Sequence, residues 1–152
     1  MDNNRKHAAV NDGLESDPGP RLERLEYREQ GCFGGIGSLL LDGRILEVSG
    51  ALPGWNGPRG PIQLTRVEID SVYRVLERRG VWGWKAEYLS GECGELVLDG
   101  RVWELRVKAR GRSHESRGTN AYPSSAANGN VSPRPGFLRQ LLHGIAMVIA
   151  VP

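Results

Sequence analysis

Three histidines and two cysteines are the residues of this chain whose types most often bind metals or perform catalysis. His7, His114 and His143 are widely separated, and no two of them have metal-ligand spacing on one predicted element. Cys32 and Cys93 are too few for a disulfide framework or a structural zinc site, and whether they pair stays open. No nucleophile elbow accompanies these residues. The sequence therefore predicts no catalytic residue, no metal ligand and no cofactor, and an enzyme with an unrecognised site is kept as an alternative.

The glycine-rich segment 31–37 has a composition found in phosphate-binding loops. It lacks the Gly-Lys-Ser/Thr ending of such loops, and a predicted strand follows it instead of a helix. We interpret the segment as a glycine bulge or a tight turn between two strands.

Basic residues are concentrated in the segment 101–117. Arg106, Lys108 and Arg110 alternate along one predicted strand, so they are expected to share a sheet face that could follow a phosphate backbone. With Arg112 they form a candidate nucleic-acid site. The other interpretation is the solvated side of an edge strand, where positive charge discourages pairing with another sheet.

Two long loops rich in glycine and proline are predicted at 50–63 and 118–136. We expect Trp55 in the first loop to be exposed near Arg59, and these two residue types dominate protein-binding hot spots. The second loop opens with Gly-Thr-Asn-Ala-Tyr-Pro at 118–123.

This Gly-Thr-Asn-Ala-Tyr-Pro segment has the composition of a turn. Gly118 allows positive φ, Asn120 can bond the neighbouring backbone, and Tyr122 is expected to pack on the rim of the core. A binding loop is the rival interpretation, because loops on rigid scaffolds often carry function. The predicted partner-binding residues are Trp55, Arg59, Asn120 and Tyr122.

The elements that position these residues begin with strands. Asp-Gly pairs at 42–43 and 99–100 each stand between two apolar runs, which is a strong hairpin signal. The strand 101–107 alternates apolar with charged residues, as a half-buried antiparallel strand does. Leu25 and Tyr27 share one face of a further predicted strand.

Two helices are predicted. Thr65 and Glu68 have capping-box spacing, apolar residues follow at helical intervals, and Gly80 supplies the stop. A second helix over 137–150 is apolar on most of its circumference and should be buried against the sheet. His143 on this helix is interpreted as a core or boundary residue. The predicted fold class is α+β, an antiparallel sheet of about four to five strands with two helices packed on one face.

Composition limits the classes of protein considered. The chain has 152 residues with 20 Lys plus Arg against 18 Asp plus Glu, so its net charge of +2 gives no global attraction to nucleic acid or to an anionic membrane. The polar segment 1–20 is predicted to be a disordered tail, and 21–152 a single domain. The amino terminus does not resemble a signal peptide, and the longest apolar stretch is too short to span a membrane. A soluble, cytoplasmic protein with no membrane partner is expected.

Two stretches resemble known proteins. The strand Trp-x-Leu-x-Val at 103–107, the turn at 118–123 and the terminal helix together resemble small uncharacterised bacterial α+β domains, which implies a fold. The segment 31–35, Gly-Cys-Phe-Gly-Gly, is similar to the Gly-Gly-Phe-Ala-Gly opening of emfourin-like proteins, with Cys32 and Gly34 as the departures. Those proteins are small cytoplasmic inhibitors of thermolysin-like metalloproteases, so this resemblance implies a protein-binding or inhibitory role without assigning residues.

The leading prediction is a non-catalytic module that binds another protein, as an inhibitor or regulator of a partner such as a protease. Nucleic-acid binding through the basic strand is the first alternative, and an enzyme is the second.

Overall fold

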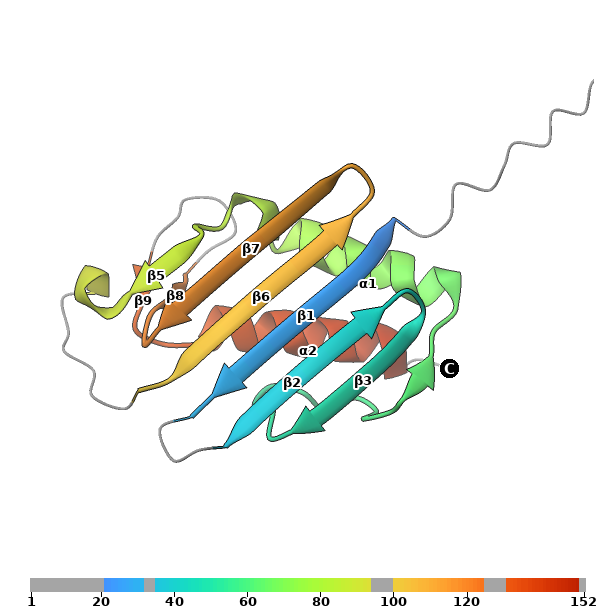
Figure 1. Ribbon diagram of the computed structural model, residues 1–152, viewed down its shortest axis with the longest axis horizontal. Coiled ribbons are helices and arrows are strands. Elements are labelled where there is room, and N and C mark those ends of the chain that lie inside the picture. Colours follow the sequence, from blue (N-terminus) through green and yellow to red (C-terminus); the bar gives the residue numbers. More distant parts are fainter. Residues whose placement is uncertain (1–20, 32–34, 94–99, 125–130, 151–152) are drawn as a thin grey trace, which may run out of the picture.

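A computed structural model describes residues 21–31, 35–93, 100–124 and 131–150 of the chain. In this part, seven strands form one sheet in the order β4-β3-β2-β1-β6-β7-β5, antiparallel except for β5 beside β7 (Figure 1). Its strands are β1 (Leu22–Gln30), β2 (Ile36–Asp42), β3 (Ile45–Gly50), β4 (Ile62–Gln63), β5 (Glu87–Leu89), β6 (Val102–Ala109) and β7 (Arg112–Thr119). The α+β class is confirmed, whereas the predicted four to five strands are too few.

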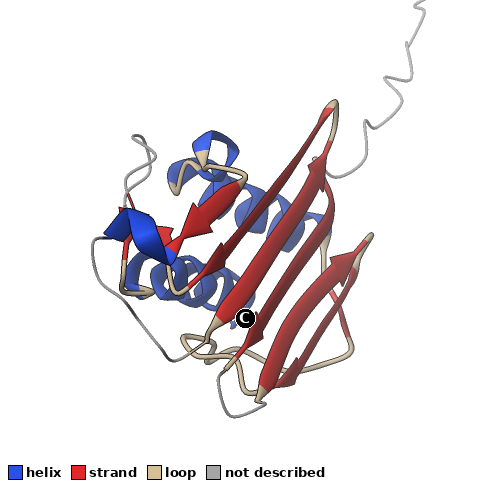
Figure 2. Ribbon diagram, turned by 60° about the vertical axis from the view of Figure 1, so that its left-hand side comes forward, coloured by secondary structure: helices blue, strands red, loops and turns tan. Residues whose placement is uncertain are grey.

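The remaining elements are short, apart from two α-helices. They are α1 (Arg66–Arg78), α2 (Gly136–Ala150), the 3-10 turns η1 (Val81–Gly83) and η2 (Ser90–Cys93), and a small ribbon of β8 (Tyr122–Pro123) and β9 (Val131–Ser132). Figure 2 shows both α-helices on the same side of the large sheet. The other side of the sheet is open.

The β1–β2–β3 meander follows local sequence signals. The glycine-rich segment joins β1 to β2, where Gly31 N donates to Gly35 O at 2.8 Å, so the predicted connection between strands is confirmed. The Asp42-Gly43 pair turns the chain into β3, with Gly43 at φ 58°. Leu25 and Tyr27 lie on the helix-covered face of β1 as expected.

The second predicted hairpin, around Asp99-Gly100, falls partly on residues that the structure does not describe. Residues 94–99 lie outside the described residues, and β6 is flanked on its two sides by β1 and β7. The hairpin that β6 does form turns at Arg110-Gly111, with Gly111 at φ 77°, and leads into β7. The sequence of β7, Arg-Ser-His-Glu-Ser-Arg-Gly-Thr, has no apolar alternation, so its strand was not predicted.

Both predicted helices are confirmed. Thr65 and Glu68 make a reciprocal capping box, and Gly80 follows α1 in the left-handed conformation at φ 63°. α2 runs along the sheet and packs against α1, burying Leu138, Leu141 and Ile145 in the single core cluster. The helices cover the face of the sheet that carries its buried apolar side chains, and an antiparallel sheet can leave its other face to solvent.

Candidate functional site

The open face of the sheet is formed by the outward side chains of strands β1 to β3 and β5 to β7. The strand register aligns these side chains in rows across the sheet. One row consists of Glu47, Leu40, Glu26, Arg106 and Glu115. The face as a whole is charged, but neither sign dominates. Its acids are Glu26, Asp42, Glu47, Glu87, Glu104 and Glu115, and its bases are Arg24, Arg28, Arg106, Lys108 and Arg117.

Ion pairs join these charges within and between strands. Arg24 contacts Asp42 at 2.8 Å on the neighbouring strand, and Arg28 contacts Glu26 at 2.9 Å on its own strand. Lys108 contacts Glu23 at 3.0 Å. Such exposed pairs contribute little to stability, about 0–1 kcal/mol each. Their consequence is a surface whose charges compensate one another locally.

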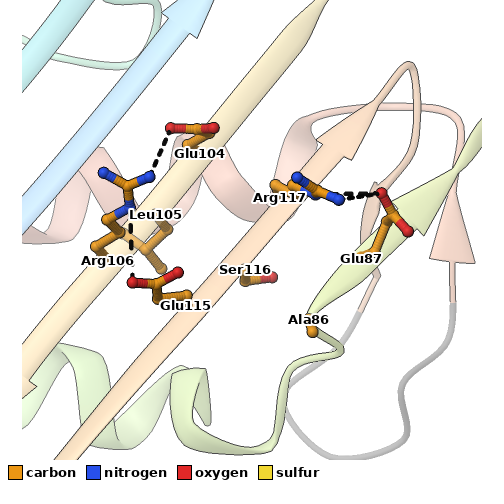
Figure 3. A pocket seen from close by; sticks show the side chains of 8 residues that line it. All are labelled: Ala86, Glu87, Glu104, Leu105, Arg106, Glu115, Ser116 and Arg117. Atoms are coloured by element: carbon orange, nitrogen blue, oxygen red, sulfur yellow. Dashed lines mark hydrogen bonds and ion pairs between the residues drawn. The ribbon is translucent and has the colours of Figure 1, made fainter.

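A hollow of about 270 Å³ lies on this face over β5, β6 and β7 (Figure 3). Arg106 lies on one side of it, 3.6 Å from Glu104 and 3.8 Å from Glu115, and Arg117 contacts Glu87 at 2.9 Å on the other side. Its lining also includes Ala86, Leu105 and Ser116. Ser116 there donates its hydroxyl to Lys85 O at 2.6 Å, so its proton is engaged with a backbone carbonyl. The hollow therefore presents charges of both signs, and the Ser116 hydroxyl in its lining bonds a backbone carbonyl.

One end of the open face is apolar. Leu89, Val102 and Ile36 are exposed by 51%, 41% and 59%, and the register places them in a single row. Gln30 and Thr119 lie between them in that row. We call these five side chains the apolar row. Sequence analysis missed it, although one signal was present: Val102 falls on the charged side of its alternating strand.

Trp55 does not occupy the predicted position. Its side chain is only 8% exposed, its Nε1 donates to Pro58 O at 3.1 Å, and it belongs to the core cluster. The predicted exposure of Trp55 is therefore wrong. Arg59 is exposed, but its side chain bonds Gly50 O and its own carbonyl accepts from Val48 N, so the loop covers the outer edge of β3.

The predicted turn after β7 is buried. Asn120 and Tyr122 are 6% and 2% exposed, and Asn120 rather than Gly118 carries positive φ, at 51°. The Asn120 side chain accepts from Arg101 N at 2.8 Å, a backbone group 19 residues away in the sequence, whereas the prediction was a bond to the neighbouring backbone. Tyr122 stacks on Trp103 at 6.2 Å, inside the core instead of at its rim. The structure does not bring these two residues and the loop at Trp55 together on an exposed surface.

The four predicted basic residues are divided between two sides of the molecule. Arg106 and Lys108 lie on the open face in ion pairs, and Arg110 lies in the turn, since β6 ends at Ala109. Arg112 packs 3.8 Å from the Trp82 ring on the helix side and pairs with Glu77. A continuous basic strand face is therefore not formed.

The two described histidines differ in environment. His114 faces the helices beside Trp82, at 6.5 Å between ring centroids, and its Nε2 is buried without a hydrogen-bond partner in the described part. Burial lowers the pKa of this imidazole. His143 is exposed on α2, so its interpretation as a core or boundary residue is wrong. His7 lies outside the described residues.

Glu29 is a buried carboxylate on the helix-covered side of β1. It is 6% exposed, accepts from the Tyr27 hydroxyl at 2.9 Å and lies 3.7 Å from Arg101. Burial, followed by the charge of Glu29 and this bond, raises the pKa of Tyr27 well above its usual value. The described residues contain no group of three or more metal-ligating side chains. Within the same residues, neither α-helix is long and apolar enough to cross a membrane.

Comparison of the chain with protein-family models, curated proteins and solved structures found no match.

Proposed function

We propose that this protein is a non-catalytic module that binds another protein through the open face of its sheet. The observation that carries the proposal is the apolar row, in which Ile36, Val102 and Leu89 stand exposed at one end of a charged surface. Isolated exposed apolar residues are ordinary, whereas several aligned on one flat face suggest a contact surface.

The apolar row and the ion pairs have different roles in this proposal. Complete burial of each half-exposed aliphatic side chain by a partner contributes about 1–2 kcal/mol. The neighbouring charges, including Arg28 and Glu104 one row away, form the polar rim that protein interfaces usually have. Because positive and negative side chains alternate on this surface, it favours a partner whose charges have the opposite sign at the facing positions.

Inhibition or regulation of a protease is the narrower form of this proposal. It is supported by the similarity of the segment 31–35 to emfourin-like proteins, of which Cys32 to Gly34 lie outside the described residues. Thermolysin is therefore the first purified candidate. The nucleic-acid alternative receives no support from the geometry, because Arg106 and Lys108 are already paired with acids.

The experiment compares partner capture by four proteins: wild type, Val102→Lys, Leu89→Lys and Ile45→Lys. Ile45 is the matched control, since it is 47% exposed on the same face at the opposite end of the strands. Each protein is cross-linked in a lysate of the source organism and assayed for inhibition of thermolysin. We expect the first two substitutions to abolish capture of a specific partner and Ile45→Lys to preserve it. Equal capture by all four proteins would refute the proposed surface.

A further inference from the structure

A second hollow lies on the outer surface of the helices, away from the open face. It has a volume of about 330 Å³, within the range of small-ligand sites. Its lining contains three basic side chains and no acid. The lining residues are Gly54, Arg79, Arg139, Gln140, His143 and Gly144.

Arg139 lines this hollow from α2. Its Nε is buried and has no hydrogen-bond partner in the described part of the chain. The loop that contains Gly54 packs closely against the Arg139 backbone, since a Cβ added to Gly54 would lie 3.1 Å from the Arg139 Cα. This Nε is closed to solvent, so an anion in the hollow would compensate the guanidinium charge without bonding this atom.

Arg79 is held in place beside it. Its guanidinium donates to Gln140 Oε1 at 3.0 Å and lies 5.4 Å from the centroid of the Phe137 ring. Because the Gln140 oxygen is engaged by Arg79, the amide NH₂ of Gln140 is left as a donor. Preorganised arginines lose less side-chain entropy when they bind a ligand.

His143 is the third basic residue of this hollow, and it lies on the same helix as Arg139. His143 follows Arg139 by one turn of α2, so the two side chains lie on neighbouring positions of the same helix face. Gly144, which also lines the hollow, allows α2 to pack closely on α1, since an added Cβ would lie 3.2 Å from Val75 Cγ1. Glu77, an acid on the neighbouring helix, is paired with Arg112.

We propose that this hollow binds a small oxyanion, a carboxylate or a phosphate group, through Arg79, Arg139 and His143. Arginine forks match the two oxygens of either group, and charge-assisted hydrogen bonds are the strong ones. The site does not depend on partner binding at the open face. Its ligand can be a free metabolite or a group carried by a larger molecule.

The test is a calorimetric titration of the full chain with sodium phosphate and with sodium malonate, at constant ionic strength in sodium chloride. We expect one saturable site for at least one of the two anions. Arg139→Gln and Arg79→Gln should each weaken binding at least about tenfold. Arg78→Gln is the matched control, because this neighbouring exposed arginine lines a different hollow, and it should leave affinity unchanged.

The two titrants separate the ligand classes. Tighter binding of phosphate would assign a phosphoryl ligand, and tighter binding of malonate a carboxylate. If Arg139→Gln fails to fold by circular dichroism, Arg139→Lys provides the test, since it keeps the charge and loses the fork. The proposal would be overturned if neither anion showed saturable binding. It would also be overturned if the Arg139 and Arg79 variants bound the anion with the same affinity as the wild type. Val102→Lys should bind the anion normally, which distinguishes this site from the open face.

Discussion

Replacement of Gly118 by alanine tests how the buried corner after β7 is built. An added Cβ would lie 2.3 Å from Ala121 O and 2.4 Å from Trp103 Nε1, which is too close for either contact. Trp103 is 1% exposed and donates that Nε1 proton to Ala121 O at 2.8 Å. The indole also packs edge-on against Trp84 at 6.3 Å and cannot move freely. Alanine must therefore displace the ring, the backbone or both.

The expected loss is about 4 kcal/mol in the free energy of unfolding. Overpacking of a filled core contributes about 1–3 kcal/mol, and loss of a buried hydrogen bond contributes about 1–3 kcal/mol. A domain of this kind has only about 5–15 kcal/mol of stability, so the variant should unfold at much lower denaturant. Urea denaturation followed by tryptophan fluorescence measures the change.

Two further variants make the reasoning refutable. Gly83→Ala is the control, since its added Cβ meets nothing within 4 Å, and we expect no loss of stability. Trp103→Phe removes the indole N–H, so Gly118→Ala should be less destabilising in that background, with a coupling of at least about 1 kcal/mol. Equal effects of Gly118→Ala and Gly83→Ala, or strict additivity with Trp103→Phe, would show that the corner is not built as described.

Three other variants test local features by chemical denaturation. Asn120→Gly should lose about 1 kcal/mol with its bond to Arg101 N, and Asn120→Ala about 1–2 kcal/mol more because of its positive φ. Thr65→Ala should lose about 1 kcal/mol by removing the cap bond to Glu68 N. Burial lowers the pKa of His114, so the unfolded chain binds this proton more readily, and stability should fall as pH drops from about 7.5 to about 5.5. His114→Gln should flatten that fall, and an unchanged pH dependence would exclude this imidazole as its source.

The fold elements found in the sequence are those with local causes. The cap at Thr65 and the Asp42-Gly43 turn depend only on neighbouring residues, so both were predicted. The strand β7 is polar along its length and is held by pairing with β6, from Ala109↔Arg112 onward. Strand order depends in the same way on contacts far apart in the sequence, such as β1 with β6, and no local pattern encodes it.

The site was harder to predict because exposure is a tertiary property. Trp55 lies in a loop rich in glycine and proline, and it is buried because that loop folds back against α2, where Gly57 lies near Ala146. The three aliphatic side chains of the apolar row come from β2, β5 and β6, strands that are distant in the sequence, and each strand contributes one of them. Only Val102 deviates from a visible pattern, and a single deviation does not identify a surface.

The compensated charges of the open face determine how its binding should respond to salt. Arg106 is shared by Glu104 and Glu115, so a partner that contacts it must replace existing pairs and gains little net attraction. Affinity must then come mainly from the apolar row, which salt does not screen. Capture through the open face should therefore change less than about tenfold between about 50 and 200 mM sodium chloride, whereas binding through several phosphate contacts would fall by roughly a thousandfold or more. A steep dependence on salt, retained in Val102→Lys, would favour a nucleic-acid ligand and would require a binding surface other than the apolar row.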